Sequence, residues 1–172
     1  KSNNCFNCPK TKNTWGLTIG YIQMKFESNY QIEGVQVGLR VEPLFKYGFG
    51  LNTGILLEAY SNDLKTIFKS YSETNLKYYN INIPLHLEYR LNISKWFNFF
   101  AYGGIGFNVF SDQLFENITL PATFEYGGGI RINHFQFNVG KSSYIGDFED
   151  ISNIGKNKRT YQNLAISMSY MF

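Results

Sequence analysis

The segment NLAISMSYMF, residues 163–172, is the stretch that decides the fold class of this chain. Apolar side chains alternate with small or polar ones along its whole length, which is the period of a β-strand with one apolar face. That face holds five residues: Leu164, Ile166, Met168, Tyr170 and Phe172. The loose polar residues that commonly follow the last element of a water-soluble domain are missing. We therefore expect a strand that continues to Phe172.

The same alternation occurs in eight segments of the chain. They are 14–24, 34–42, 45–60, 76–91, 96–109, 123–132, 134–143 and 160–172. The connections after the second, fourth and sixth segments are short, whereas those after the first, third, fifth and seventh are long. Short turns at one end and long loops at the other are typical of outer-membrane barrels. The pattern predicts an all-β fold, an eight-stranded antiparallel up-and-down transmembrane β-barrel over residues 14–172. Residues 1–13 are expected to form a polar N-terminal tail, with both termini on the short-turn, periplasmic side.

Composition and charge exclude two other classes. The chain has 172 residues, which is the size of one domain. Its mean hydropathy is −0.25, and no apolar run approaches the ~18 residues of a membrane-spanning helix. The net charge is +3, but the lysines are scattered among acidic residues and form no basic stripe. A helical membrane protein and a nucleic-acid-binding protein are therefore not expected.

The placement of charge distinguishes a membrane barrel from a soluble one. The charged strand residues lie on the face opposite the bulky apolar residues: Arg40, Glu42, Glu58, Glu88, Arg90, Glu125 and Arg131. On the apolar face the only charged residue is Lys141, near a strand end. A cationic side chain that faces lipid at the bilayer midplane costs about 2–4 kcal/mol. The pattern predicts an apolar outer wall and an ionic network in a narrow, glycine-rich lumen. The soluble alternative is a lipocalin-like lipid-binding barrel.

Aromatic residues are enriched at both ends of the predicted strands. Trp15 and Trp96 begin strands at the short-turn end, while Phe107 and Phe124 lie toward the long-loop end. Two aromatic belts are expected of a membrane barrel.

Two stretches carry a family resemblance. YYNINIPLHLEYRL (78–91) and FAYGGIGFNVF (100–110) resemble the fourth strand and the glycine-rich fifth strand of small outer-membrane β-barrels of Bacteroidetes-type bacteria, the PorT-like and OmpA-like eight-stranded group. The resemblance implies a location in the bacterial outer membrane, in contact with outer-membrane lipid and lipopolysaccharide. The segment 164–172 also resembles the C-terminal signal that the barrel-assembly machinery reads during insertion. Pro84 lies inside the fourth strand, where the loss of a ladder hydrogen bond predicts a bulge.

Few residues of the chain point to catalysis. Cys5 and Cys8 form a CxxC motif in the tail, but two cysteines without a nearby histidine do not complete a zinc site. In an oxidising periplasm they are expected to form a disulfide or to stay inert, and docking of the tail to a partner is the remaining alternative. His86 is expected in the lumen and His134 at a turn, whereas a lipid hydrolase needs its triad at the lipid-facing surface. No cofactor is expected.

These observations predict a non-enzymatic outer-membrane barrel with a structural or accessory role. In that role it is a subunit or partner of a larger outer-membrane complex. The alternatives are a lipid-modifying barrel enzyme and the soluble lipid-binding barrel.

Overall fold

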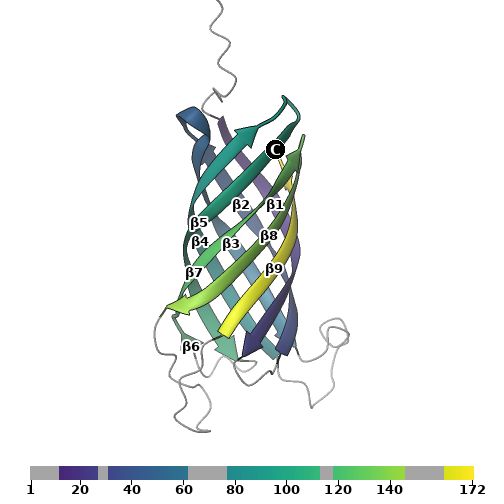
Figure 1. The fold of residues 1–172 in the computed structure, drawn as a ribbon. Helices are drawn as coiled ribbons and strands as arrows, with labels where there is room; N and C mark the ends of the chain where they lie inside the picture. Colours follow the sequence, from purple (N-terminus) through teal and green to yellow (C-terminus); the bar gives the residue numbers. More distant parts are fainter. Residues whose placement is uncertain (1–11, 27–30, 62–76, 113–117, 146–160) are drawn as a thin grey trace, which may run out of the picture.

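A computed structural model of the chain describes residues 12–26, 31–61, 77–112, 118–145 and 161–172. Eight long strands form one barrel (Figure 1). They are β1 (Lys12–Phe26), β2 (Gln31–Leu44), β3 (Phe49–Ser61), β4 (Lys77–Asn92), β5 (Phe97–Asp112), β7 (Ala122–Ile132), β8 (Phe135–Ile145) and β9 (Tyr161–Met171). A two-residue strand, β6 (Ile118–Thr119), pairs with β5 near its end. No helix among these residues is long and apolar enough to cross a membrane.

The barrel is closed by the pairing of its last strand with its first. β9 pairs antiparallel with β8 on one side and with β1 on the other, and the remaining long strands pair with their sequence neighbours. The Phe172 amide donates to the Trp15 carbonyl oxygen at 2.7 Å, which continues the β1–β9 ladder past Met171. Closure removes the free edges of the sheet. The predicted eight-stranded antiparallel up-and-down barrel is confirmed, and β1 begins at Lys12, two residues before the predicted boundary.

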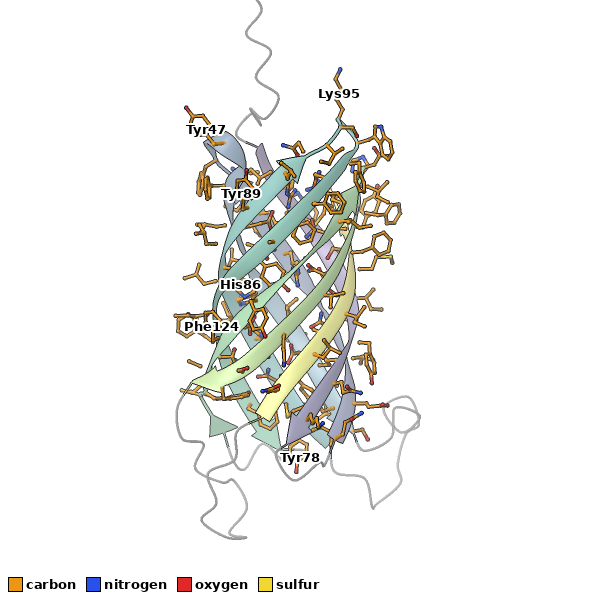
Figure 2. All side chains as sticks on the ribbon, in the orientation of Figure 1. Tyr47, Tyr78, His86, Tyr89, Lys95 and Phe124 are labelled. Carbon is orange, nitrogen blue, oxygen red and sulfur yellow. The ribbon has the colours of Figure 1, made fainter. Side chains whose placement is uncertain are left out.

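The ends of β1, β3, β5 and β8 lie at one end of the barrel, which we call the long-loop end, and the short turns lie at the other (Figure 1). The chain enters β1 and ends after β9 at the short-turn end. Figure 2 shows Tyr47 and Lys95 at this end and Tyr78 at the long-loop end. The predicted asymmetry of the connections is therefore present in the fold.

Side chains of each strand alternate between an apolar outer wall and a buried lumen. On β1, for example, Leu17 is 54% exposed and Thr18 only 4%. Because successive side chains of a strand point to opposite faces, the two-residue period of the sequence translates directly into outside and inside. Large apolar side chains cover the outer wall, as predicted.

The third strand begins later than predicted. Residues 45–48 do not belong to it, because Lys46–Gly48 form the 3₁₀ turn η1. Tyr47 and Gly48 have φ angles of 65° and 84°, in the left-handed region that no strand uses. The Phe45 amide donates to the Phe49 carbonyl oxygen at 2.6 Å and closes the turn. The expectation that Tyr47 and Gly48 alternate across a strand is wrong for this reason.

The predicted bulge at Pro84 is also wrong. The pairs Thr53–Leu85 and Leu56–Asn82 lie on either side of it and keep one register between β3 and β4. On the other side, Pro84 pairs with Gly106 of β5 without interruption. The ladder is interrupted opposite Pro84 and resumes without an inserted residue.

Candidate functional site

The lumen is the candidate functional site, and its short-turn end contains a layer of buried ion pairs. Glu42 lies near the end of β2, Glu88 and Arg90 near the end of β4, and Arg131 near the end of β7. Arg90 Nη2 donates to Glu42 Oε2 at 2.8 Å, and Arg90 also pairs with Glu88. Arg131 Nη1 lies 3.7 Å from Glu42 Oε2. Two carboxylates and two guanidinium groups thus balance each other in formal charge.

Amide side chains complete this ionic layer. Asn52 Nδ2 donates to both carboxylates, to Glu42 at 3.3 Å and to Glu88 at 3.1 Å. Gln136 Nε2 donates to Glu42 at 2.7 Å. Glu42, Glu88, Asn52 and Gln136 each have a relative exposure of 0%. Buried charges are tolerated only when they are paired and hydrogen-bonded, and this arrangement meets both conditions.

A second cluster of polar residues lies around Glu125, nearer the middle of the barrel. His86 Nε2 lies 2.8 Å from Glu125 Oε2, and Asn82 Nδ2 donates to Glu125 Oε1 at 2.9 Å. Thr123 donates to the same oxygen at 2.8 Å. The His86 ring stacks on Tyr102 with centroids 4.8 Å apart. Figure 2 shows His86 between the two ends of the barrel.

Hydrogen bonds between side chains connect Glu58 to this second cluster. Glu58 Oε2 accepts from the Tyr60 hydroxyl at 2.7 Å and from Asn80 at 2.8 Å. Asn80 donates to Asn108 Oδ1 at 2.7 Å, and Asn108 donates to Thr123 at 3.0 Å. The two carboxylates of the middle layer are therefore joined through neutral groups.

The seven charged residues named from the sequence all lie in the lumen, but they do not form one network. Four of them form the ionic layer, while Glu58 and Glu125 belong to the middle cluster. Arg40 has no carboxylate within 4.0 Å in the described part of the chain. With the Asn138 amide oriented to offer its oxygen, Arg40 Nη1 donates to it at 2.6 Å.

A cavity of about 40 Å³ lies beside the middle cluster. Its lining includes Arg40, Glu58, Asn82, His86 and Glu125. Arg40 Nε, Asn82 Oδ1 and His86 Nδ1 are buried and have no hydrogen-bond partner. A polar cavity of this size has room for about two or three waters.

An apolar cluster occupies the long-loop end of the lumen. It consists of buried residues from four strands: Ile22, Met24, Ile32, Tyr60 and Phe110. We call this cluster the apolar plug. Ile22 also lines the cavity, so the plug borders the polar middle of the lumen. The plug was not predicted from the sequence, although Ile22 and Met24 lie at even-numbered positions of β1, as does the inward-facing Thr18.

The neutral polar residues of the lumen were also missed. Asn52, Asn82, Asn108, Thr123 and Gln136 all contact the named carboxylates or each other. Their inward parity was the available signal, but asparagine and glutamine occur on so many surfaces that parity alone did not single them out.

The five outward residues of the last strand lie where the pattern placed them. Leu164, Ile166, Met168, Tyr170 and Phe172 are each between 39% and 50% exposed. The Phe172 ring stacks on Trp15 with centroids 4.4 Å apart. Cys5 and Cys8, named for a disulfide, lie outside the described residues.

His134 lies at the turn between β7 and β8, as expected. Its Nδ1 donates to the Met171 carbonyl oxygen at 2.8 Å, and its ring stacks on Tyr170 with centroids 5.6 Å apart. Among the described residues, no three His, Cys, Asp or Glu side chains gather as a metal site.

Solved structures with the same fold define the class of this protein. Neisserial surface protein A aligns with 95% of this chain and 100% of its own, with a TM-score of 0.59 and 9% identity. Ail, the attachment invasion locus protein of Yersinia pestis, was solved with the heparin analogue sucrose octasulfate. It aligns with 94% of this chain and 99% of its own, with a TM-score of 0.51 and 12% identity. The outer membrane enzyme PagL aligns with 92% of this chain and 99% of its own, with a TM-score of 0.52 and 9% identity.

No protein-family model matches the chain, and no curated protein matches it significantly. The structural likeness, at these low identities, concerns the fold. Together with the apolar outer wall and the polar lumen, it defines an eight-stranded transmembrane β-barrel of the type found in bacterial outer membranes.

Proposed function

We propose that this protein is a non-enzymatic barrel of the bacterial outer membrane. We further propose a structural or accessory role, as a subunit or partner of a larger outer-membrane complex. The resemblance of residues 78–91 and 100–110 to the PorT-like and OmpA-like group of Bacteroidetes-type bacteria supports a membership in that group. Both termini then face the periplasm, and the long connections face outward.

The observation that carries this proposal is the occupied lumen. The ionic layer fills the short-turn end with fully buried side chains, and the apolar plug fills the long-loop end. Between them, the described residues line a cavity of about 40 Å³. A solute larger than a few waters has no room there, so the surfaces left for function are the outer wall, the connections and the tail.

The partners of the two histidines also support a non-enzymatic role. His86 is paired with Glu125 inside the lumen, away from the lipid-facing surface. His134 uses Nδ1 to bind a backbone carbonyl oxygen. A nucleophile-activating histidine needs a hydroxyl on one ring nitrogen and an orienting acid on the other. Neither histidine has these two partners among the described residues.

The soluble alternative is disfavoured by the outer wall. Leu17, Ile19, Leu57 and Leu87 are each more than half exposed, and they belong to a wall that extends around the barrel. A contiguous apolar surface of this kind is not stable in water. Lipid is the environment that it fits.

Extraction from outer membranes in a mild detergent tests the accessory role. The expected result is a complex larger than a lone 19.9-kDa barrel, with the same outer-membrane proteins in a fixed ratio after cross-linking in intact cells. A preparation treated with a harsh detergent before cross-linking is the control. A lone barrel in mild detergent would contradict the accessory role, and release without detergent would contradict the membrane location.

An epitope inserted within 62–76 tests the orientation, because it should be cleaved by a protease added to intact cells.

A further inference from the structure

One sector of the outer wall differs from the rest in its polarity. On β4, β5 and β7, bulky residues such as Ile81, Phe107 and Phe124 continue the apolar wall toward the long-loop end. On β8, β9 and β1 the wall changes earlier. On β8 the outward residue after Val139 is Lys141, and on β9 the outward residue beyond Leu164 is Gln162. On β1, Tyr21 is followed outward by Gln23 and then by Lys25. We call Lys141, Gln162, Gln23 and Lys25 the basic rim.

Lys141 is the residue that requires an explanation. It is exposed and paired in register with Tyr126 on β7 and with Leu164 on β9, so two lipid-facing side chains flank it. It lies four residues before the end of β8 at Ile145. A lysine on a lipid-facing wall is unfavourable unless its ammonium group reaches the interface or an anion.

Lys25 lies on the same sector, within reach of the same ligand. Gln162 pairs with Lys25 on one side and with Ser143 on the other, and Lys141 is the next outward residue on β8. Two strand spacings and two residues along a strand separate the two lysine Cα atoms by roughly 12 Å. Long lysine side chains can close this distance on a headgroup that carries more than one phosphate.

No acidic group among the described residues occupies the two lysines. Neither forms an ion pair with any carboxylate in that part of the chain. Glu33 is half-buried on the neighbouring strand β2, where it is paired in register with Gln23. Gln23 Nε2 donates to the Tyr21 hydroxyl at 3.3 Å. The basic rim itself offers two ammonium groups and two side-chain amides, which complement an anion.

We propose that the basic rim binds the phosphorylated headgroup of a lipid, with Lys141 and Lys25 as the charged contacts and Gln162 between them. Val139, Ile166 and Leu164 lie directly below the rim and would contact the acyl chains of the same molecule. The orientation proposed above places this lipid in the outer leaflet. Binding itself does not depend on that orientation or on the accessory role.

Lipid A added to the delipidated full chain in neutral detergent, followed by native mass spectrometry, tests the site. Each lysine near a charged lipid surface contributes about fivefold in binding. We expect K141Q to weaken lipid A binding about fivefold, and K25Q/K141Q roughly 25-fold. K141R should retain binding because it keeps the charge. K95Q, at the opposite end of the barrel (Figure 2), removes the same charge and should leave binding unchanged.

The choice of variants and lipids keeps the result decisive. K141M places an apolar side chain on the lipid-facing wall, so it should fold at least as well as the parent chain while losing the same affinity as K141Q. Dephosphorylated lipid A should bind at least tenfold more weakly than lipid A to the parent chain. Inorganic phosphate alone, at equal concentration, should not displace the lipid. Equal binding by the parent chain and K25Q/K141Q, an equal loss in K95Q, or equal binding of dephosphorylated lipid A would each overturn the proposal.

Discussion

Replacement of Glu42 by glutamine is the sharpest test of the ionic layer. Glu42 is fully buried and uses both carboxylate oxygens. Oε2 faces Arg90 at 2.8 Å and Arg131 at 3.7 Å, while Oε1 accepts from Gln136 and Asn52. Glutamine has the same shape but no charge, so E42Q leaves Glu88 alone against two buried guanidinium groups.

The expected cost follows from that imbalance. Loss of one partner from a buried ion pair destabilises a protein by about 3–5 kcal/mol. E42Q should lie at the lower end, about 3 kcal/mol, because its amide oxygen can still accept from Arg90. Its amide nitrogen would then face Gln136, whose own Oε1 has no partner and can accept after a flip of the amide. E42L offers no acceptor at all and should cost about 5 kcal/mol.

Equilibrium unfolding in urea, with the barrel in lipid vesicles, measures this difference. Trp15 and Trp96 are 52% and 58% exposed on the outer wall, so their fluorescence should report the loss of lipid contact. E33Q is the matched control, because it removes a half-buried carboxylate from the same strand and should change the free energy of unfolding by less than about 0.5 kcal/mol.

A second substitution separates charge balance from packing. E42Q/R131Q restores neutrality in the layer, so it should recover about half of the stability lost in E42Q. The reasoning is refuted if E42Q unfolds within about 1 kcal/mol of the parent chain. It is also refuted if the double variant is no more stable than E42Q.

Three other substitutions test local features of the fold. In G104V, the new Cβ would lie 2.7 Å from the Cα of His86, so we expect a loss of at least about 2 kcal/mol and a smaller folded fraction on an unheated gel. Y47G should raise the free energy of unfolding by about 1 kcal/mol, since it relieves a left-handed φ of 65° in an exposed turn; an unchanged urea midpoint would contradict this. F172S removes the stack on Trp15, worth about 1 kcal/mol. If the last strand also serves as the assembly signal, F172S should reduce the barrel in outer membranes far more than this stability loss explains.

The sequence predicted the wall of the barrel because the relevant pattern is local. Inward and outward positions follow from a two-residue period, and Leu17 and Thr18 illustrate how closely exposure follows it. The closing strand was also predictable, because 163–172 alternates without a break. Tyr47 was not, since nothing in its side chain indicates a left-handed backbone and a tyrosine at that φ is uncommon.

The contacts across the lumen could not be derived from the same pattern. Glu42 meets Arg90 across 48 residues, and His86 meets Glu125 across 39. Which inward residues face one another depends on the stagger of the strands around the barrel, and a single sequence does not specify that stagger. The two-residue alternation therefore placed all seven charged residues in the lumen, but it did not show which belong to the ionic layer and which to the middle cluster.

The charged residues of the lumen help to explain how the chain specifies a single register of its strands. Apolar side chains of the plug, such as Ile22 and Met24, are compatible with either face of the wall, since lipid and a dry lumen are both apolar. The charged residues are not. A one-residue slip of β4 would turn Arg90 and Glu88 outward and remove from Glu42 its arginine partner at 2.8 Å. Loss of one partner from a buried ion pair costs about 3–5 kcal/mol. Buried ion pairs often add little net stability over apolar packing. We therefore expect the ionic layer to contribute mainly by making neighbouring registers of β2, β4 and β7 unfavourable.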